Sequence, residues 1–213
     1  SNDQVHGKQL DIALCLQQRI PDRIKLIQVP IRCEYPDAHP PTNNMFRARG
    51  FVYKLLGAVC ANLEGQQALY IYENGFGAIN LPFQLSEIGM AHPRSVHPIS
   101  LIKTGQFVSK LLGVEFKYHN PYLFSTKAQM CEAIRDDVQL AFNTISCDGQ
   151  HRQANQPSQC GYCSSCLLRR VALINALGDD KTEYAITHGN IARQRSHYEH
   201  FAAMKHQIFN LKE

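Results

Sequence analysis

The spacing of apolar residues along the chain predicts a series of helices. Residues 9–19 carry leucine and alanine at helical intervals, and Pro21 then stops the helix. A longer helix is expected over residues 46–63, ended by Gly65, because Phe51 and Leu55 continue into an apolar stripe of every fourth residue. Further helices are expected over residues 99–112, 127–135, 164–177 and about 190–211.

Three short stretches have the composition of β-strands. Residues 24–31 alternate in part and are rich in β-branched side chains, and residues 114–118 alternate strictly. Residues 68–72 are apolar throughout, as expected of a strand in a parallel sheet that helices cover on both faces. The order strand, helix, strand therefore predicts an α/β fold with a doubly wound, parallel-sheet core.

Two polar segments flank the apolar strand and the long helix. Residues 73–77 follow the strand directly, and ligands in such sheets bind beyond the carboxyl ends of the strands. Asn74 in this loop is explained on the residues alone by a turn. Arg47 and Arg49 stand at the start of the long helix, where two guanidiniums could clamp a phosphate or carboxylate. Because these arginines lie on different faces, solvated side chains explain them equally well.

The composition is that of a globular protein, with 213 residues of which 44% are hydrophobic and 19% charged. No run approaches the roughly 18–20 apolar residues of a membrane span, and no secretory leader is visible. The net charge of +4 permits an anionic ligand but falls short of the basic surface typical of nucleic-acid binding. We therefore expect a soluble, cytoplasmic protein that does not bind membranes. Nucleic-acid binding ranks last among the function classes, with basic support only from Arg169, Arg170, Arg193 and Arg195.

The strongest chemical signal is a group of four cysteines in the pattern C-x12-C-x2-C-x2-C: Cys147, Cys160, Cys163 and Cys166. Two-residue spacing lets neighbouring thiolates point at one ion about 2.3 Å away, and Gly161 lets the backbone turn without a Cβ clash. Four thiolates close a tetrahedral shell, which is typical of structural zinc. The remaining cysteines are expected to be small buried side chains: Cys15, Cys33, Cys60 and Cys131.

Three alternatives to zinc stay open for this cluster. A thiol redox pair would leave Cys147 and Cys166 without a role. A ferredoxin-type iron–sulfur cluster would need another cysteine just after Cys166, where residues 167–170 are Leu-Leu-Arg-Arg. Four reduced, buried cysteines without a metal are the third alternative.

Several of these segments together resemble the 7-cyano-7-deazaguanine synthase group of queuosine biosynthesis. The resemblance covers about residues 5–175, and its most specific part is the run Cys-Gly-Tyr-Cys-Ser-Ser-Cys-Leu-Leu-Arg-Arg at residues 160–170. Further matching segments are residues 44–51, 68–75 and 125–127, together with Cys147. The His-Pro dipeptides at residues 92–93 and 97–98 and the Asn-Pro-Tyr at 120–122 resemble a divergent branch, some members of which serve in anti-phage defence operons.

This resemblance implies an adenine-nucleotide-hydrolase-like fold of the PP-loop ATPase superfamily. Enzymes of the group use ATP to adenylate a substrate carboxylate, ammonia then displaces AMP to give an amide, and a second activation dehydrates the amide to a nitrile. The implied cofactors are zinc, ATP and Mg. Carried over by motif, Arg47 and Arg49 would border the nucleotide or substrate, Asn74 and Gly75 would line the pocket at the strand end, and Lys127 would lie near it.

The sequence departs from the superfamily at the pyrophosphate-binding loop, because no Ser-Gly-Gly-x-Asp-Ser segment occurs in it. The predicted organisation is a PP-loop-ATPase-like core without its first strand or strands (residues 1–146), followed by a zinc-binding loop and carboxy-terminal helices packed on the core (residues 147–213). We expect a ligase part that is inactive without an upstream segment or partner protein. The alternative is a non-catalytic, zinc-stabilised module that binds a nucleotide or a protein, including in an anti-phage defence system.

Overall fold

The computed structural model describes residues 3–31, 49–79, 95–147, 159–187 and 195–210. The protein is mostly helical with a small parallel sheet, so the predicted α/β class is confirmed. The chain divides into two compact units, a helical unit (residues 1–32, 83–88 and 127–213) and a sheet unit (residues 33–82 and 89–126). These units do not follow the predicted division into residues 1–146 and 147–213, which stays a prediction.

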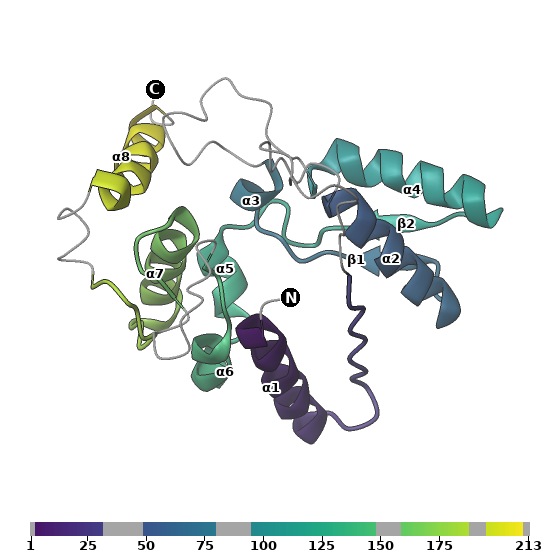
Figure 1. The fold of residues 1–213 in the computed structure, drawn as a ribbon, viewed down its shortest axis with the longest axis horizontal. Coiled ribbons are helices and arrows are strands. Elements are labelled where there is room, and N and C mark those ends of the chain that lie inside the picture. The colour runs from purple at the N-terminus through teal and green to yellow at the C-terminus, as the bar shows by residue number, and fades with distance from the viewer. Residues whose placement is uncertain (1–2, 32–48, 80–94, 148–158, 188–194, 211–213) are drawn as a thin grey trace, which may run out of the picture. The chain divides into compact units, whose positions relative to one another are not determined.

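The sheet unit holds both strands that the structure assigns within the described residues, and they run parallel (Figure 1). Its elements are α2 (Arg49–Leu63), β1 (Ala68–Tyr70), α3 (Gly75–Ile79), α4 (Pro98–Leu112) and β2 (Lys117–His119). Leu69 of β1 pairs with Tyr118 of β2, and both pack against buried Ala58 and Val108 from helices α2 and α4. The chain passes from β1 to β2 through α3 and α4, whereas the β-α-β order predicted from the sequence begins with residues 24–31.

Local signals fix the ends of α4. Pro98 occupies the first turn, where its missing N–H costs nothing, and the His97 side chain accepts a hydrogen bond from the Ile99 amide at 3.3 Å. Gly113 ends the helix in the left-handed conformation with φ of 70°. His97 is therefore a helix cap, whereas His92 lies outside the described residues.

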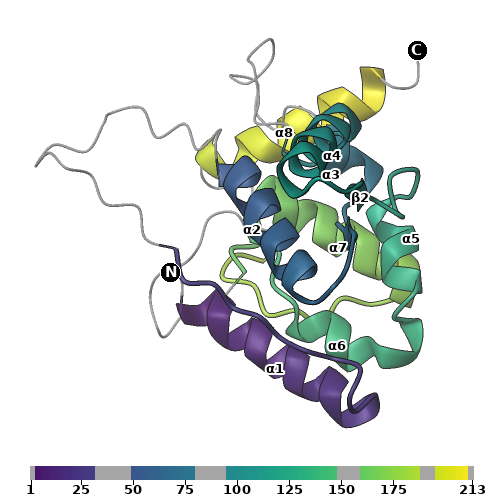
Figure 2. The same ribbon diagram turned by 90° about the vertical axis from the view of Figure 1, so that its right-hand side faces the viewer.

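The helical unit contains α1 (Asp3–Arg19), α5 (Lys127–Glu132), α6 (Val138–Asn143), α7 (Ser164–Leu177) and α8 (Arg195–Asn210). Helix α7 packs against α5 and α8, and α1 lies beside α6 (Figure 2). Arg19 at the end of α1 forms an ion pair with Asp137, which caps α6 by accepting a hydrogen bond from Leu140. The inward side of α7 is buried: Leu167, Ala172, Leu173 and Ala176.

The prediction of a strand over residues 24–31 is wrong, because the structure assigns no strand there. A strand needs a hydrogen-bonded neighbour as well as an alternating pattern. Within the described residues β1 and β2 pair only with each other, and Leu26, Ile27, Val29 and Ile31 are 37–47% exposed. A doubly wound sheet and a PP-loop core therefore stay predictions.

Other boundaries shift by a few residues. The helix predicted over residues 9–19 begins at Asp3, and the helix predicted to begin at residue 46 is described from Arg49. The helix predicted over residues 127–135 ends at Glu132 and is followed by a 3-10 turn at Arg135–Asp137. Of the helices in the described residues, none is both long and apolar enough to cross a bilayer.

Candidate metal centre

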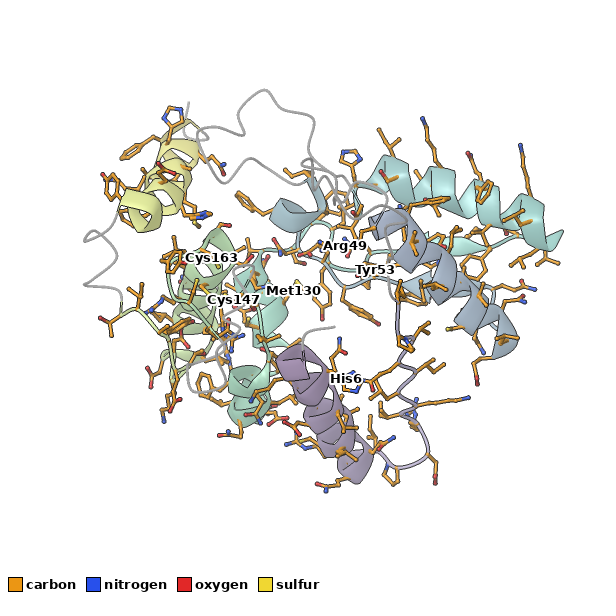
Figure 3. The ribbon with its side chains drawn as sticks, in the orientation of Figure 1. His6, Arg49, Tyr53, Met130, Cys147 and Cys163 are labelled. Carbon is orange, nitrogen blue, oxygen red and sulfur yellow. The ribbon has the colours of Figure 1, made fainter. Side chains whose placement is uncertain are left out.

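The four predicted cysteine ligands come together in the helical unit. Their sulfur atoms all lie within 4.8 Å of one another, and Figure 3 shows Cys147 and Cys163 side by side at α7. The Sγ–Sγ distance is 3.8 Å between Cys160 and Cys166 and 4.0 Å between Cys147 and Cys163. Sulfurs about 2.3 Å from one tetrahedral ion stand about 3.8 Å apart. The four cysteines are free thiols, and they could hold a metal ion such as zinc.

Three separate pieces of chain position these sulfurs. Cys163 caps α7 by accepting from the Cys166 amide at 3.4 Å, so both residues are fixed by the start of that helix. Cys160 precedes the helix on a short extended segment, where its carbonyl accepts from the Ile186 amide at 3.0 Å. Cys147 arrives from the segment that follows α6, and its sulfur accepts from the Cys160 amide at 3.4 Å. The helix start alone thus supplies half of the ligand set.

Backbone amides surround the sulfurs as donors. The Cys160 sulfur accepts from the amides of Tyr162 at 3.4 Å and Cys163 at 3.2 Å. As given above, the sulfurs of Cys147 and Cys163 each accept from one amide as well. Donors aimed at sulfur stabilise the thiolate over the thiol, and the thiolate is the form that binds metal. The local backbone is therefore arranged for anionic sulfur at three of the four positions.

Gly161 makes the tight turn possible. Its φ is +86°, and a Cβ there would lie 2.3 Å from the Ile186 carbonyl oxygen. The sequence-based prediction that this glycine avoids a Cβ clash is confirmed. The clash comes from the segment containing Tyr184 and Ile186, which sequence spacing did not reveal.

Crowding of the sulfurs separates their proton affinities. Hydrogen bonding from Cys160 lowers the pKa of Cys147, whereas contact with Cys147 raises the pKa of both Cys160 and Cys166. One negative charge in the cluster disfavours the next, so the thiols resist ionising together when no cation is near them. A divalent ion would let all four bind as thiolates and would release protons as it bound.

The donor set defines the chemistry of the site. Four sulfurs suit a soft or borderline ion and leave no open position for water or substrate, so the site could stabilise structure but not activate water. Because all four sulfurs converge on one point, the arrangement favours a single ion over a redox pair. It also disfavours a multi-iron cluster, in which cysteine sulfurs bind separate irons and stand farther apart.

The residues that the resemblance assigns to nucleotide binding are not gathered as the cysteines are. Arg47 lies outside the described residues. Arg49 is exposed in the first turn of α2 (Figure 3), and Lys127 begins α5 in the helical unit. Asn74 is only 2% exposed. Its Oδ1 accepts from the Gly77 amide at 3.2 Å, so its side chain caps α3, as the turn interpretation expects.

Gly75 is required by close packing of its own unit. A Cβ at Gly75 would lie 2.6 Å from the Leu123 carbonyl oxygen, and the Gly75 amide donates to the Ser125 carbonyl at 3.0 Å. The loop after β1 is thus pinned to the loop after β2, at the carboxyl ends of both strands. Of the carried-over residues that the structure describes in this unit, Arg49, Asn74 and Gly75 do not line its 570 Å³ cavity, whose lining includes Tyr70, Lys117 and His119.

Two polar residues beside the cysteines escaped the sequence reasoning. Gln159 is 1% exposed and Arg169 is 3% exposed, and both bind the segment that carries Cys147. A single signal pointed to Arg169, its position three residues after Cys166 on a helix, which places it one turn along the same face. No signal in the sequence marked Gln159.

Comparison with known proteins adds no relative, since neither the models of protein families nor the curated proteins that were searched give a match to this chain.

Proposed function

We propose that the chain is the carboxy-terminal part of an ATP-dependent carbon–nitrogen ligase of the 7-cyano-7-deazaguanine synthase-like group, in which the four cysteines bind one structural zinc ion. The observation that carries the proposal is the convergence of the four sulfurs within 4.8 Å. The same cysteine run is the most specific part of the resemblance to that group. A motif that forms the closed ligand shell expected of it supports the kinship more than the motif alone.

The zinc ion would hold together chain segments that have little apolar core between them. The cysteine cluster is surrounded by Tyr162 and Tyr184, and the chain from residue 148 to residue 158 is rich in glutamine, asparagine and serine. Zinc would join Cys147, at the end of one segment, to the start of α7. Its role in the ligase would therefore be structural, with the chemistry elsewhere.

The sheet unit supports the ligase part of the proposal. A parallel pair of strands three residues long is too small to be stable alone, and parallel sheets are normally covered on both faces. Here α2 and α4 pack against Leu69 and Tyr118, whereas the rings of Tyr70 and His119 stack on each other. A PP-loop core would add further strands at the outer edges of this pair, where the described residues form no other strand.

Metal analysis of a matched pair of variants tests the zinc site. The purified wild-type protein should contain close to one zinc per chain. Cys163→Ser should lose the metal and several kcal/mol of unfolding free energy, because a serine hydroxyl can still cap α7 but does not replace the thiolate ligand. Cys131→Ser is the control, since Cys131 is a part-buried thiol of the same unit that lies outside the cluster. Equal zinc content in wild type and Cys163→Ser would refute the site.

Nucleotide turnover tests the ligase. The chain alone should release no AMP from Mg–ATP. The protein encoded by the complete reading frame should release AMP in the presence of ammonium and a carboxylate substrate. Calorimetric titration of the chain with Mg–ATP should show binding that weakens in Arg49→Ala but not in Lys103→Ala, an exposed cation of the same unit. If the protein encoded by the complete reading frame releases no AMP while the chain still binds zinc, the protein is a non-catalytic binding module.

A further inference from the structure

A buried arginine lies on α7, one turn after the last cysteine of the cluster. Arg169 is only 3% exposed, although arginine is among the residues least often buried. Its Nη1 donates to Thr144 Oγ1 at 2.7 Å and to Ser146 Oγ at 3.4 Å. Its Nη2 donates to the Ala141 carbonyl at 2.7 Å, and its Nε donates to Thr182 Oγ1 at 3.2 Å.

All of these acceptors are neutral. In the part of the chain that the structure describes, no carboxylate forms an ion pair with Arg169. Asp180 is tied into the same loop, but it accepts instead from the Tyr184 hydroxyl at 2.7 Å and the Thr182 amide at 3.0 Å. A buried charge is costly unless an opposite charge lies near it. The hydrogen bonds satisfy four of the five guanidinium N–H donors and supply no opposite charge.

The cysteine cluster would supply the opposite charge if it held a divalent ion. Four thiolates and one zinc ion carry a net charge of −2, whereas four neutral thiols carry none. Arg169 follows the ligand Cys166 by one helical turn. Its acceptors Thr144 and Ser146 lie three residues and one residue before the ligand Cys147. The guanidinium therefore binds the segment that leads into Cys147, while Arg169 itself stands one turn after Cys166.

Gln159 closes a rigid frame between the arginine and the sulfurs. Its Nε2 donates to the Thr144 carbonyl at 3.1 Å, and its Oε1 accepts from the Ser146 amide at 3.3 Å. The same Oε1 lies 3.6 Å from the Cys166 sulfur. Gln159 and Arg169 thus both bind Thr144 and Ser146, in the segment that delivers Cys147 to the cluster.

We propose that Arg169 is the charge partner and positioning residue of the four-cysteine metal centre. Its guanidinium balances part of the negative charge of the metal-bound thiolates and holds the segment carrying Cys147 in register with α7. This inference rests on the proposed zinc site. A merely structural arginine would contribute equally with and without the metal, whereas a charge partner contributes mainly when the metal is bound.

Zinc affinity and stability of three variants test the inference. Arg169→Met keeps the aliphatic stem and removes the charge, and Arg169→Lys keeps the charge and loses the forked donors. Lys181→Met is the control, because it removes an exposed positive charge from the adjoining loop. Affinity is measured by competition with a chromophoric zinc chelator, and unfolding is measured in urea for the zinc-loaded and the metal-free protein.

Arg169→Met should weaken zinc binding by about ten- to a hundredfold, Arg169→Lys by less, and Lys181→Met by less than about twofold. The urea midpoint of Arg169→Met should fall in the zinc-loaded protein and stay the same or rise in the metal-free protein. If Arg169→Met does not fold, the test rests on Arg169→Lys, which keeps the positive charge. Unfolding of Arg169→Lys, or a loss of zinc affinity beyond a hundredfold, would overturn the proposal that the charge of Arg169 stabilises the metal centre.

Equal zinc affinity in wild type and Arg169→Met also overturns the inference and leaves the zinc site intact. If the wild-type protein binds no zinc, the zinc site itself fails, and the role of Arg169 fails with it. The two failures are thus distinguished by the wild-type measurement.

Discussion

Replacing Gly161 by alanine should disable the metal centre through a backbone clash. The new Cβ would lie 2.3 Å from the Ile186 carbonyl oxygen, well inside any van der Waals contact. That carbonyl belongs to a backbone segment and cannot rotate away as a side chain can. The segment must move by about 1 Å, or the turn between Cys160 and Cys163 must open, to restore ordinary contact distances.

The magnitude follows from what the movement breaks. Alanine at a φ of +86° costs about 1–2 kcal/mol in backbone strain alone. Moving Ile186 also weakens its amide bond to the Cys160 carbonyl at 3.0 Å and the bond from Arg170 at 2.9 Å. At about 1 kcal/mol for each hydrogen bond, the total destabilisation is about 3–4 kcal/mol.

Gly178→Ala provides the matched control. Gly178 ends α7 with φ of +79°, but nothing lies within 4 Å of the position its Cβ would take. It should therefore cost only the backbone strain, about 1–2 kcal/mol. Urea unfolding of the zinc-loaded proteins, with zinc content measured in parallel, separates strain from clash. Equal losses in the two variants, with zinc retained in Gly161→Ala, would refute the reasoning.

Two further predictions concern the packing of each unit. Tyr118→Phe should cost about 1 kcal/mol in urea unfolding, because the buried hydroxyl, whose pKa burial raises to about 12, donates to the Lys54 carbonyl at 2.9 Å; an unchanged midpoint would contradict this. Asp137→Asn should flatten the acid limb of stability. The hydrogen bond from Arg19 lowers the pKa of Asp137, so this stabilisation is present above the ordinary pKa of 3.8 and is lost as pH falls through the lowered folded-state pKa. Asp136→Asn changes an exposed neighbour and should leave the acid limb as in wild type. Identical acid limbs in wild type, Asp137→Asn and Asp136→Asn would show that the ion pair of Arg19 and Asp137 does not stabilise the protein.

Elements with local stop and start signals were predictable from the sequence. Helix α7 spans Ser164–Leu177 as predicted, because Cys163 caps its first turn and Gly178 takes the left-handed conformation at its end. Helix α4 begins one residue before the prediction, at Pro98, with Gly113 at its end. In each case the deciding residues are neighbours in sequence, so no knowledge of the fold was needed.

A strand forms only where another strand pairs with it, and for this reason the strand predictions were less accurate than the helix predictions. Residues 24–31 have a strand-like composition, yet no hydrogen-bonded neighbour among the described residues makes them one. The strand predicted over residues 114–118 shifts to Lys117–His119, because its register is set by pairing with β1. The pattern of a strand reports which face could be buried, and only tertiary structure decides whether that burial occurs.

The candidate site divides in the same way. The spacing of Cys160, Cys163 and Cys166 alone puts these sulfurs near one another, and the structure gathers them as predicted. The sequence assigns Cys147 to the site only because a tetrahedral ion needs a fourth ligand. The fold decides whether Cys147 lies near the other three cysteines. The burial of Arg169 was beyond reach, since arginine on a helix is solvated unless tertiary neighbours enclose it.

The two buried clusters of the protein, one in each unit, differ in their chemistry. In the sheet unit, Ala58, Val108 and Phe116 form an apolar cluster that burial alone can stabilise. In the helical unit the buried cluster around α7 consists of cysteines, with Cys147, Tyr162 and Tyr184 packed on it and no branched aliphatic side chain among those members.

Burying a cysteine contributes about 1 kcal/mol or less, whereas binding of zinc to four thiolates contributes about 10–16 kcal/mol at neutral pH. A cluster of this composition is therefore weak as a hydrophobic core and strong as a metal site. The amide donors at three sulfurs favour the thiolate over the thiol, and the left-handed turn at Gly161 lets the chain bend between Cys160 and Cys163. Both features fit a cluster that could hold a metal ion.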